Sequence, residues 1–232
     1  MDASTKAELA KVDYHTILLG GGVDSSALLS LVEKSNDPSK ILIVHISYGQ
    51  KAVSSERLSC IAQARKYNIP KENLVFLSMD LGFASCGIMP QTDLDTSVAA
   101  NNVLELRNPM LINLAACYLA TKYPGLIHYL YVGFHKEPSD TAFKDAVASR
   151  YITSLSESIN GSLSNPKTKI FIRAPFKHRT RERILKRLIR DRGLDFVTNF
   201  VHTCYERVPC GTCTHCVWLN NQLNIIKESS ND

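Results

Sequence analysis

The chain has 232 residues, of which 44% are hydrophobic and 21% are charged. This composition is ordinary for a globular protein with an apolar core, and it excludes a chain that is mainly disordered or collagen-like. No apolar run reaches the roughly 20 residues of a membrane helix, and the first 15 residues lack the apolar stretch of a secretory signal, so we expect a cytoplasmic protein. The net charge is +5, and most of the excess lies between Lys167 and Arg192, which creates a local positive field.

Short apolar runs alternate with stretches of helical composition along the whole chain. In chain order, the predicted elements are a strand at 16–19, a helix at 27–32, a strand at 41–46, a helix at 54–67, a strand at 74–77, a helix at 106–123, a strand at 128–133, a helix at 142–159, a strand at 170–172 and a helix at 180–190. Thr180 is expected to cap the last helix. This alternation predicts an α/β fold, with a parallel sheet covered by helices on both faces. Ligands of such folds bind at the carboxyl ends of the strands, so the loops that follow the strands should surround one site.

Three glycines, Gly20, Gly21 and Gly22, stand between the first predicted strand and its helix. Without Cβ atoms the backbone can approach an anion closely, and the start of the helix adds positive potential. The turn has neither the ending of a Walker A loop nor the spacing of a dinucleotide-binding loop. Asp24 and Ser25 suit contacts with Mg²⁺ and phosphate. A tight turn and a capped helix without any ligand is the alternative.

The run Gly20-Gly21-Gly22-Val23-Asp24-Ser25 resembles the SGGxDS loop of the PP-loop ATP pyrophosphatases. Enzymes of that family activate a substrate oxygen with AMP and release pyrophosphate. The resemblance implies a Rossmann-like PP-loop fold of the HUP type that binds ATP with Mg²⁺. Gly20 stands where the family has Ser, so one phosphate-binding hydroxyl is missing.

Four cysteines lie close together near the end of the chain, at Cys204, Cys210, Cys213 and Cys216. Four soft thiolate ligands at this spacing suit one tetrahedral zinc ion, and a closed site of this kind is structural. A redox disulfide and chance clustering are the alternatives, and His215 could compete as a ligand. We therefore predict two parts, a PP-loop domain over 1–202 and a zinc-binding segment over 203–232 packed on it.

The glycine turn and the cysteines together resemble the QueC family of 7-cyano-7-deazaguanine synthases. Tyr48-Gly49-Gln50, Arg107-Asn108, Gly133 and Pro175 match further motifs of that family. Its members are zinc-containing homodimers that adenylate 7-carboxy-7-deazaguanine with ATP and Mg²⁺. They add ammonia to give the amide, and then form the nitrile. The resemblance implies a carbon–nitrogen ligase of queuosine biosynthesis.

Residue roles follow from the same resemblance. It implies that the catalytic groups are Asp24, Ser25, Arg107 and Arg181. It implies that ATP and the base are bound through the glycine turn and four further segments, by Gly20, Gly21, Gly22, Asp24, Ser25, Tyr48, Gln50, Asn108, Gly133 and Asp145. Tyr48, Gln50 and Asn108 could equally be turn or cap residues.

Several positions depart from the family pattern. Arg181 stands where the family usually has Lys, and the family's Arg after the last cysteine is replaced at Leu219. The family's aspartate-bearing loop survives only at 143–147. These changes fit a divergent paralogue.

Two other functions remain open. QueC-like proteins of anti-phage systems, including type IV CBASS and Qat, attach a deazaguanine to the N-terminal amine of a partner protein, and the basic segment 177–192 could dock an acidic acceptor. The same segment could be a solvated amphipathic helix with Ile184, Leu185, Leu188 and Ile189 facing inward. A nucleic-acid-binding module without activity is the second alternative, but the modest charge and sparse aromatics disfavour nucleic acid.

Overall fold

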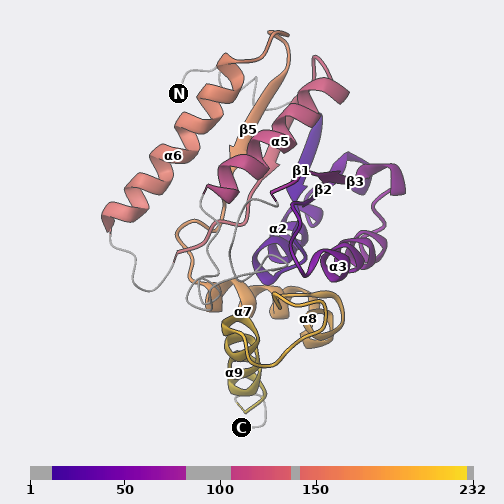
Figure 1. The fold of residues 1–232 in the computed structure, drawn as a ribbon, viewed down its shortest axis with the longest axis vertical. Coiled ribbons are helices and arrows are strands. Elements are labelled where there is room, and N and C mark those ends of the chain that lie inside the picture. Colours follow the sequence, from indigo (N-terminus) through magenta and orange to yellow (C-terminus); the bar gives the residue numbers. More distant parts are fainter. Residues whose placement is uncertain (1–11, 82–105, 137–141, 229–232) are drawn as a thin grey trace.

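Five parallel strands form one sheet in the order β3-β2-β1-β4-β5 in the computed structural model (Figure 1). The structure describes residues 12–81, 106–136 and 142–228, without the side chains of 142–148. The strands are β1 (Tyr14–Leu18), β2 (Ile41–Ser47), β3 (Leu74–Ser78), β4 (Ile127–Tyr131) and β5 (Lys169–Arg173). All seven residues of β2 are buried, as expected for a strand inside a parallel sheet with both faces covered.

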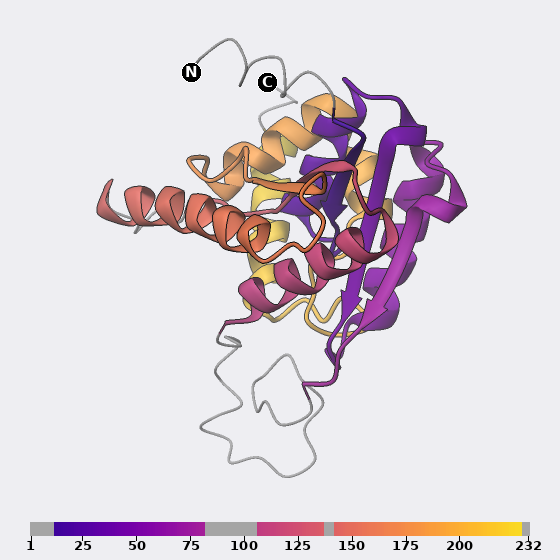
Figure 2. The same cartoon turned by 90° about the horizontal axis from the view of Figure 1, so that it is seen from above.

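Helices cover both faces of the sheet, which confirms the predicted α/β, Rossmann-like class. They are α2 (Val23–Glu33), α3 (Val53–Lys66), α5 (Arg107–Lys122), α6 (Ala142–Gly161), α7 (Arg181–Arg192), α8 (Leu194–Phe200) and α9 (Thr214–Glu228), with short 3₁₀ turns at Pro38–Lys40 and Lys71–Asn73. The layers can be followed in Figure 1 and, from above, in Figure 2.

Alternate residues of the central strands pack in two separate cores, because successive side chains of a strand point to opposite faces of the sheet. Ile41 and Ile43 of β2 pack in the core that contains residues of α2, α3, α7 and α8. Leu42 and Val44 pack in the other core, with residues of α5 and α6. This arrangement leaves the carboxyl ends of the strands for the loops that carry the candidate site.

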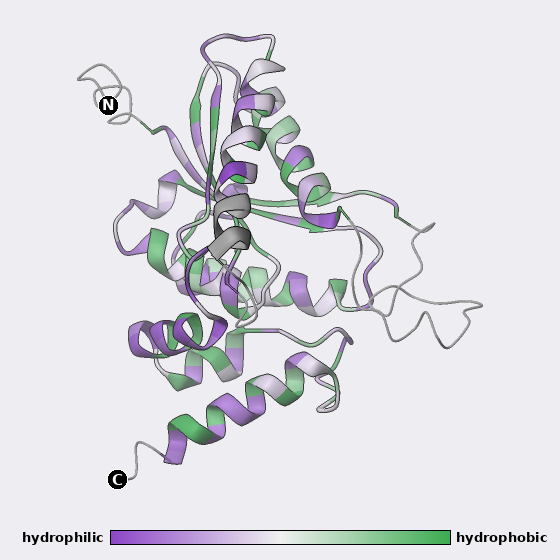
Figure 3. Cartoon of the chain, turned by 90° about the vertical axis from the view of Figure 1, so that its left-hand side faces the viewer, coloured by the Kyte–Doolittle hydropathy of each residue, from purple (hydrophilic) through white to green (hydrophobic). Residues whose placement is uncertain are grey.

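The structure differs from the sequence prediction mainly towards the C-terminus. α8 and α9 were not predicted, because α8 has seven residues and α9 begins inside the cysteine cluster. Thr180 is the N-cap residue of α7, but its side chain makes no capping hydrogen bond, so the predicted cap was wrong in that respect. Figure 3 shows both hydrophobic and hydrophilic residues on α9.

The inward face of the basic helix α7 is as predicted. Ile184, Leu185 and Leu188 are buried, and Ile189 packs against the same core. Arg187 and Arg190 both form ion pairs with Asp191. The observed helix is therefore amphipathic. Across the described ranges, none of the helices combines the length and apolar character needed to cross a bilayer.

Candidate active site

A cavity of ≈ 890 Å³ lies at the carboxyl ends of β1, β2 and β4. Ten of the predicted site residues line it, namely Gly20, Gly22, Asp24, Ser25, Tyr48, Gln50, Arg107, Asn108, Gly133 and Arg181. Gly21 lies in the same turn without lining the cavity, and the side chain of Asp145 lies outside the described residues. Five chain segments that are distant in the sequence thus meet where the strand order predicts a ligand site.

Gly21, which does not line the cavity, determines the backbone conformation of the turn between β1 and α2. Its φ of +79° lies in the left-handed region, and a Cβ there would stand 2.9 Å from Ser59 Oγ. Its carbonyl accepts hydrogen bonds from the backbone N–H of His202 (2.9 Å) and from the Ser59 hydroxyl (3.3 Å). Glycine is therefore required at this position, because another residue would be strained at this φ and its Cβ would clash with Ser59.

The start of α2 faces the cavity without a capping side chain. The Ser25 hydroxyl donates to the carbonyl of Gly22 at 3.3 Å. Gly133, after β4, comes so close that a Cβ would stand 3.4 Å from both Asp24 Cβ and the backbone nitrogen of Ser25. First-turn N–H groups that lack partners, together with the helix dipole, form a site suited to phosphate.

Asp24 has charged and titratable neighbours on two sides. Its Oδ2 lies 3.7 Å from Arg181 Nε and 3.4 Å from His135 Nδ1. Its other oxygen, Oδ1, is buried and has no hydrogen-bond partner among the described residues. A buried, unpartnered carboxylate oxygen beside a phosphate-type helix terminus fits a Mg²⁺ ligand.

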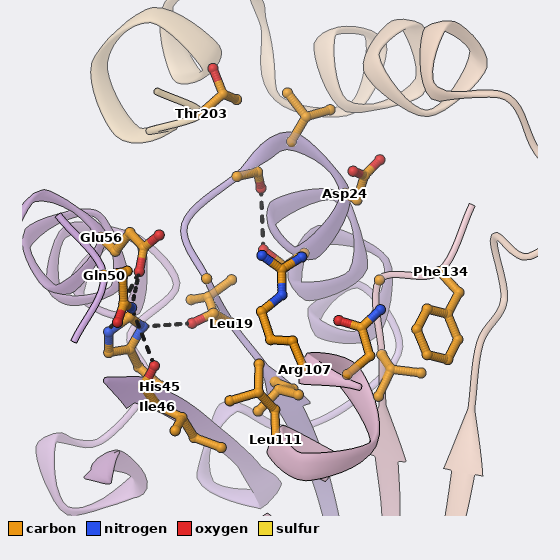
Figure 4. Close-up of a pocket in the computed structure, with 18 of the residues that line it drawn as sticks. Leu19, Asp24, His45, Ile46, Gln50, Glu56, Arg107, Leu111, Phe134 and Thr203 are labelled. Atoms are coloured by element: carbon orange, nitrogen blue, oxygen red, sulfur yellow. Dashed lines mark hydrogen bonds and ion pairs between the residues drawn. The ribbon is translucent and has the colours of Figure 1, made fainter. Parts of the chain in front are cut away.

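A second carboxylate, Glu56, lines the opposite end of the cavity. Figure 4 shows Glu56, Gln50 and His45 on one side and Asp24 on the other, with the Arg107 side chain between them in this view. Gln50 Nε2 donates to Glu56 Oε2 at 2.7 Å, and Gln50 Oε1 accepts from the Tyr48 N–H at 2.8 Å. These contacts give Gln50 a turn-stabilising and positioning role, one of the two readings that the sequence left open.

Burial shifts the pKa values of two titratable side chains at this end of the cavity, Glu56 and His45. It raises the pKa of Glu56, against the opposing effects of the Gln50 amide and the Arg107 charge. Burial also lowers the pKa of His45 to about 4, so the ring is neutral near pH 7, and its Nδ1–H donates to the Leu19 carbonyl at 3.1 Å. From the sequence, Glu56 was predicted only to lie at the start of the helix at 54–67, and no local pattern marked His45.

The four predicted cysteine ligands lie together. Their Sγ atoms all lie within 4.8 Å of one another. In a tetrahedral zinc site with Zn–S bonds of about 2.3 Å, the sulfurs stand about 3.8 Å apart, so the cluster fits one zinc ion. Backbone N–H groups of Glu206 and Cys210 donate to Cys204 Sγ at 3.3 Å.

Backbone donors also favour the thiolate form within the cluster. The N–H of Cys213 donates to Cys210 Sγ at 3.3 Å, and that of Cys216 donates to Cys213 Sγ at 3.4 Å. The Cys213 N–H, with contacts from Thr212, lowers the pKa of Cys210 to about 6, whereas burial raises the pKa of Cys204 and of Cys216. A thiolate is the form that binds zinc.

The cysteine segment also lines the cavity, through Thr203, Cys204, Tyr205 and His215. His215 does not join the sulfurs. Its Nδ1–H donates to the Thr203 carbonyl at 3.1 Å, and its Nε2 accepts from the Tyr205 hydroxyl at 3.0 Å. The two rings lie 4.4 Å apart. The rings are tilted by 34° and form an aromatic surface at the cavity that the sequence did not predict.

These features define a Rossmann-like α/β protein with a phosphate-type glycine turn and a four-cysteine cluster at one cavity. The family model for the queuosine biosynthesis protein QueC matches residues 15–226, so the chain belongs to the QueC family. It is 28% identical over 213 residues to the 7-cyano-7-deazaguanine synthase of Methanospirillum hungatei JF-1, over 86% of this chain and 89% of that protein. At the level of the family, this is an ATP-using enzyme of the ligase type.

Proposed function

We propose that the protein adenylates 7-carboxy-7-deazaguanine with ATP and passes the acyl group to ammonia, giving the amide. A second ATP then adenylates the amide oxygen, which leaves with AMP as the nitrile of 7-cyano-7-deazaguanine forms. The observation that carries this proposal is that the glycine turn and the cysteine segment line the same cavity, in a chain similar to a 7-cyano-7-deazaguanine synthase. A carboxylate is a poor electrophile, so an amine can displace it only after a good leaving group such as AMP is attached.

The glycine-turn end of the cavity would bind the triphosphate. The N–H groups at the start of α2 supply hydrogen-bond donors, and the Ser25 hydroxyl would turn from the Gly22 carbonyl to the phosphates. Arg181 and Arg107 neutralise the charge that develops as pyrophosphate leaves. Asp24 Oδ1 would hold Mg²⁺, which supplies further neutralisation of phosphate charge when bound.

The other walls of the cavity would bind the deazaguanine. Tyr205 and His215 offer aromatic rings, and Phe134 lines the cavity from the β4 side. A flat heterocycle gains from stacking on such rings and from exclusion of water. Asn108 at the start of α5 supplies an amide for hydrogen bonding to the base.

Glu56 would take the proton in the amide-forming step. The nitrogen lone pair of ammonia attacks the acyl carbon and the C–N bond forms. The bond between that carbon and the AMP oxygen breaks, with its electron pair going to AMP. One N–H proton passes to the Glu56 carboxylate, whose raised pKa makes it a stronger base than an exposed carboxylate.

Zinc, held by Cys204, Cys210, Cys213 and Cys216, would fix the fold of the cysteine segment. The division at 202/203, the homodimer and a cytoplasmic location stay predictions. Conjugation to a protein amine also stays a prediction, and the amphipathic packing of α7 gives it no particular support.

Mass spectrometry of reactions with 7-carboxy-7-deazaguanine, ATP and Mg²⁺, with and without ammonium, tests the proposal. We expect AMP, pyrophosphate and the cyano base when ammonium is present. Accumulation of the adenylate alone, despite ammonium, would favour a protein acceptor. No ATP consumption, with salt-dependent binding of random oligonucleotides, would favour the nucleic-acid-binding alternative.

A further inference from the structure

The sequence contains a single tryptophan, Trp218, and it lies directly against a candidate active-site arginine. Cζ of Arg181 stands 4.1 Å from the centre of the Trp218 ring. Trp218 Nε1 lies 3.5 Å from Glu182 Oε1, within reach of a hydrogen bond. One side chain of α9 therefore contacts the first two residues of α7.

Arg181 lies between this ring and the phosphate end of the cavity. Its side chain is 15% exposed, and its Nε lies 3.7 Å from Asp24 Oδ2. The same Nε has no hydrogen-bond partner among the described residues. A long arginine side chain loses rotamer freedom when it binds a phosphate, and a ring stacked on the guanidinium restricts that freedom in advance.

We propose that Trp218 is a positioning residue that holds the Arg181 guanidinium at the phosphate end of the cavity, so that α9 assists in binding ATP. This inference rests on the proposed function. It also gives a physical reason for Arg at a position where the resembled family usually has Lys. A planar guanidinium stacks on an indole and keeps its N–H edge for phosphate, whereas an ammonium group presents no flat face.

A double-mutant cycle separates this role from a merely structural one. Calorimetry would give the Kd of ATP with Mg²⁺ for the zinc-loaded wild type, Trp218→Leu, Arg181→Lys and the double variant. We expect Trp218→Leu to raise the Kd for ATP about three- to tenfold when residue 181 is Arg, and less than about twofold when residue 181 is Lys. Equal effects in the two backgrounds would overturn the proposal.

Two further variants control for damage to the fold. Trp218→Phe keeps an aromatic face and should retain most of the affinity for ATP, with unchanged zinc content. Val217→Ala, at the neighbouring position with 44% exposure, should leave the Kd unchanged. A Trp218→Phe protein that contains zinc yet binds ATP as weakly as Trp218→Leu would contradict the stacking role.

Fluorescence provides an independent measurement, because all tryptophan emission comes from Trp218. ATP with Mg²⁺ should shift or quench this emission in the wild type, and the change should be smaller in Arg181→Lys. ATP binding in calorimetry without any emission change would overturn the positioning role alone. No ATP binding by either method would overturn the proposed function as well.

Discussion

The two walls of the cavity are held in place by different forces. The glycine-turn wall stands on β1 and α2, where Ile17, Val23 and Leu28 are completely buried. On the opposite wall, Cys216 is the one buried residue among the described side chains of α9, and four sulfurs lie within 4.8 Å of one another. The first wall is set by apolar burial and backbone hydrogen bonds. On the second wall, Trp218, Leu219, Leu223 and Ile226 pack against the core but stay partly exposed, so we expect this wall to depend on metal binding as well. Substitutions in the two walls should therefore have different effects on the folded structure and on activity.

The largest effect is expected from loss of the metal. Cys213→Ser removes one of four thiolates, so zinc content should fall and ATP turnover should drop more than about 100-fold as residues 203–228 lose their fold. Hydrogen exchange should show lost protection there, with the sheet still protected. Cys117→Ser, an exposed thiol on α5, is the control. A zinc-free protein with full turnover would show that the two walls do not differ as described.

Asp24→Asn tests the first wall. The change keeps the shape of the side chain but removes the negative charge near Arg181, which the proposed Mg²⁺ site would also need. ATP–pyrophosphate exchange should therefore fall about 100-fold without a change in zinc content. Asp37→Asn, in a remote exposed turn, is the matched control. Exchange within threefold of the wild type would exclude a role for this carboxylate in adenylation.

Glu56→Gln should affect adenylation and amide formation differently. Pyrophosphate exchange should stay near wild type, whereas amide formation should fall about 30-fold or more. Because only the carboxylate accepts a proton, the amide-forming rate should rise with pH through the raised pKa of Glu56, and Gln should abolish that rise. The control is Glu72→Gln, at an exposed position. Equal losses in both steps would assign Glu56 a structural role.

The smallest expected effect is a gain of affinity from Gly20→Ser. Nothing lies within 4 Å of a Cβ built at Gly20, so the family's hydroxyl should be accommodated without strain. One added hydrogen bond to phosphate should lower the Kd for ATP by about two- to tenfold. A calorimetric titration checks it. Weaker binding would indicate that the turn of this chain has adapted to glycine.

The parts of the site that the sequence predicts are those encoded within a few residues. The glycine turn, Asp24 with Ser25, and the cysteine spacing are all local patterns, and the structure brings them to one cavity. The alternation of strands and helices likewise predicts the parallel sheet.

The missed features depend on contacts between residues that are distant in the sequence. Arg181 and Trp218 meet because α9 packs back against α7, and neither helix reveals this alone. Glu56 is a half-buried carboxylate at the cavity, and the Arg107 charge that acts on it comes from α5, far away in the sequence. The direction of His215, into the cavity and away from the sulfurs, depends on the Thr203 carbonyl.

Transfer of an oxygen isotope tests the central claim of adenylation most directly. With 7-carboxy-7-deazaguanine labelled with ¹⁸O in its carboxylate, the attacking oxygen should leave with AMP when ammonia displaces it. Mass spectrometry should then find one ¹⁸O atom in the AMP formed and none in pyrophosphate. Release of ADP with the label in phosphate, or unlabelled AMP alongside amide product, would contradict an acyl-adenylate pathway.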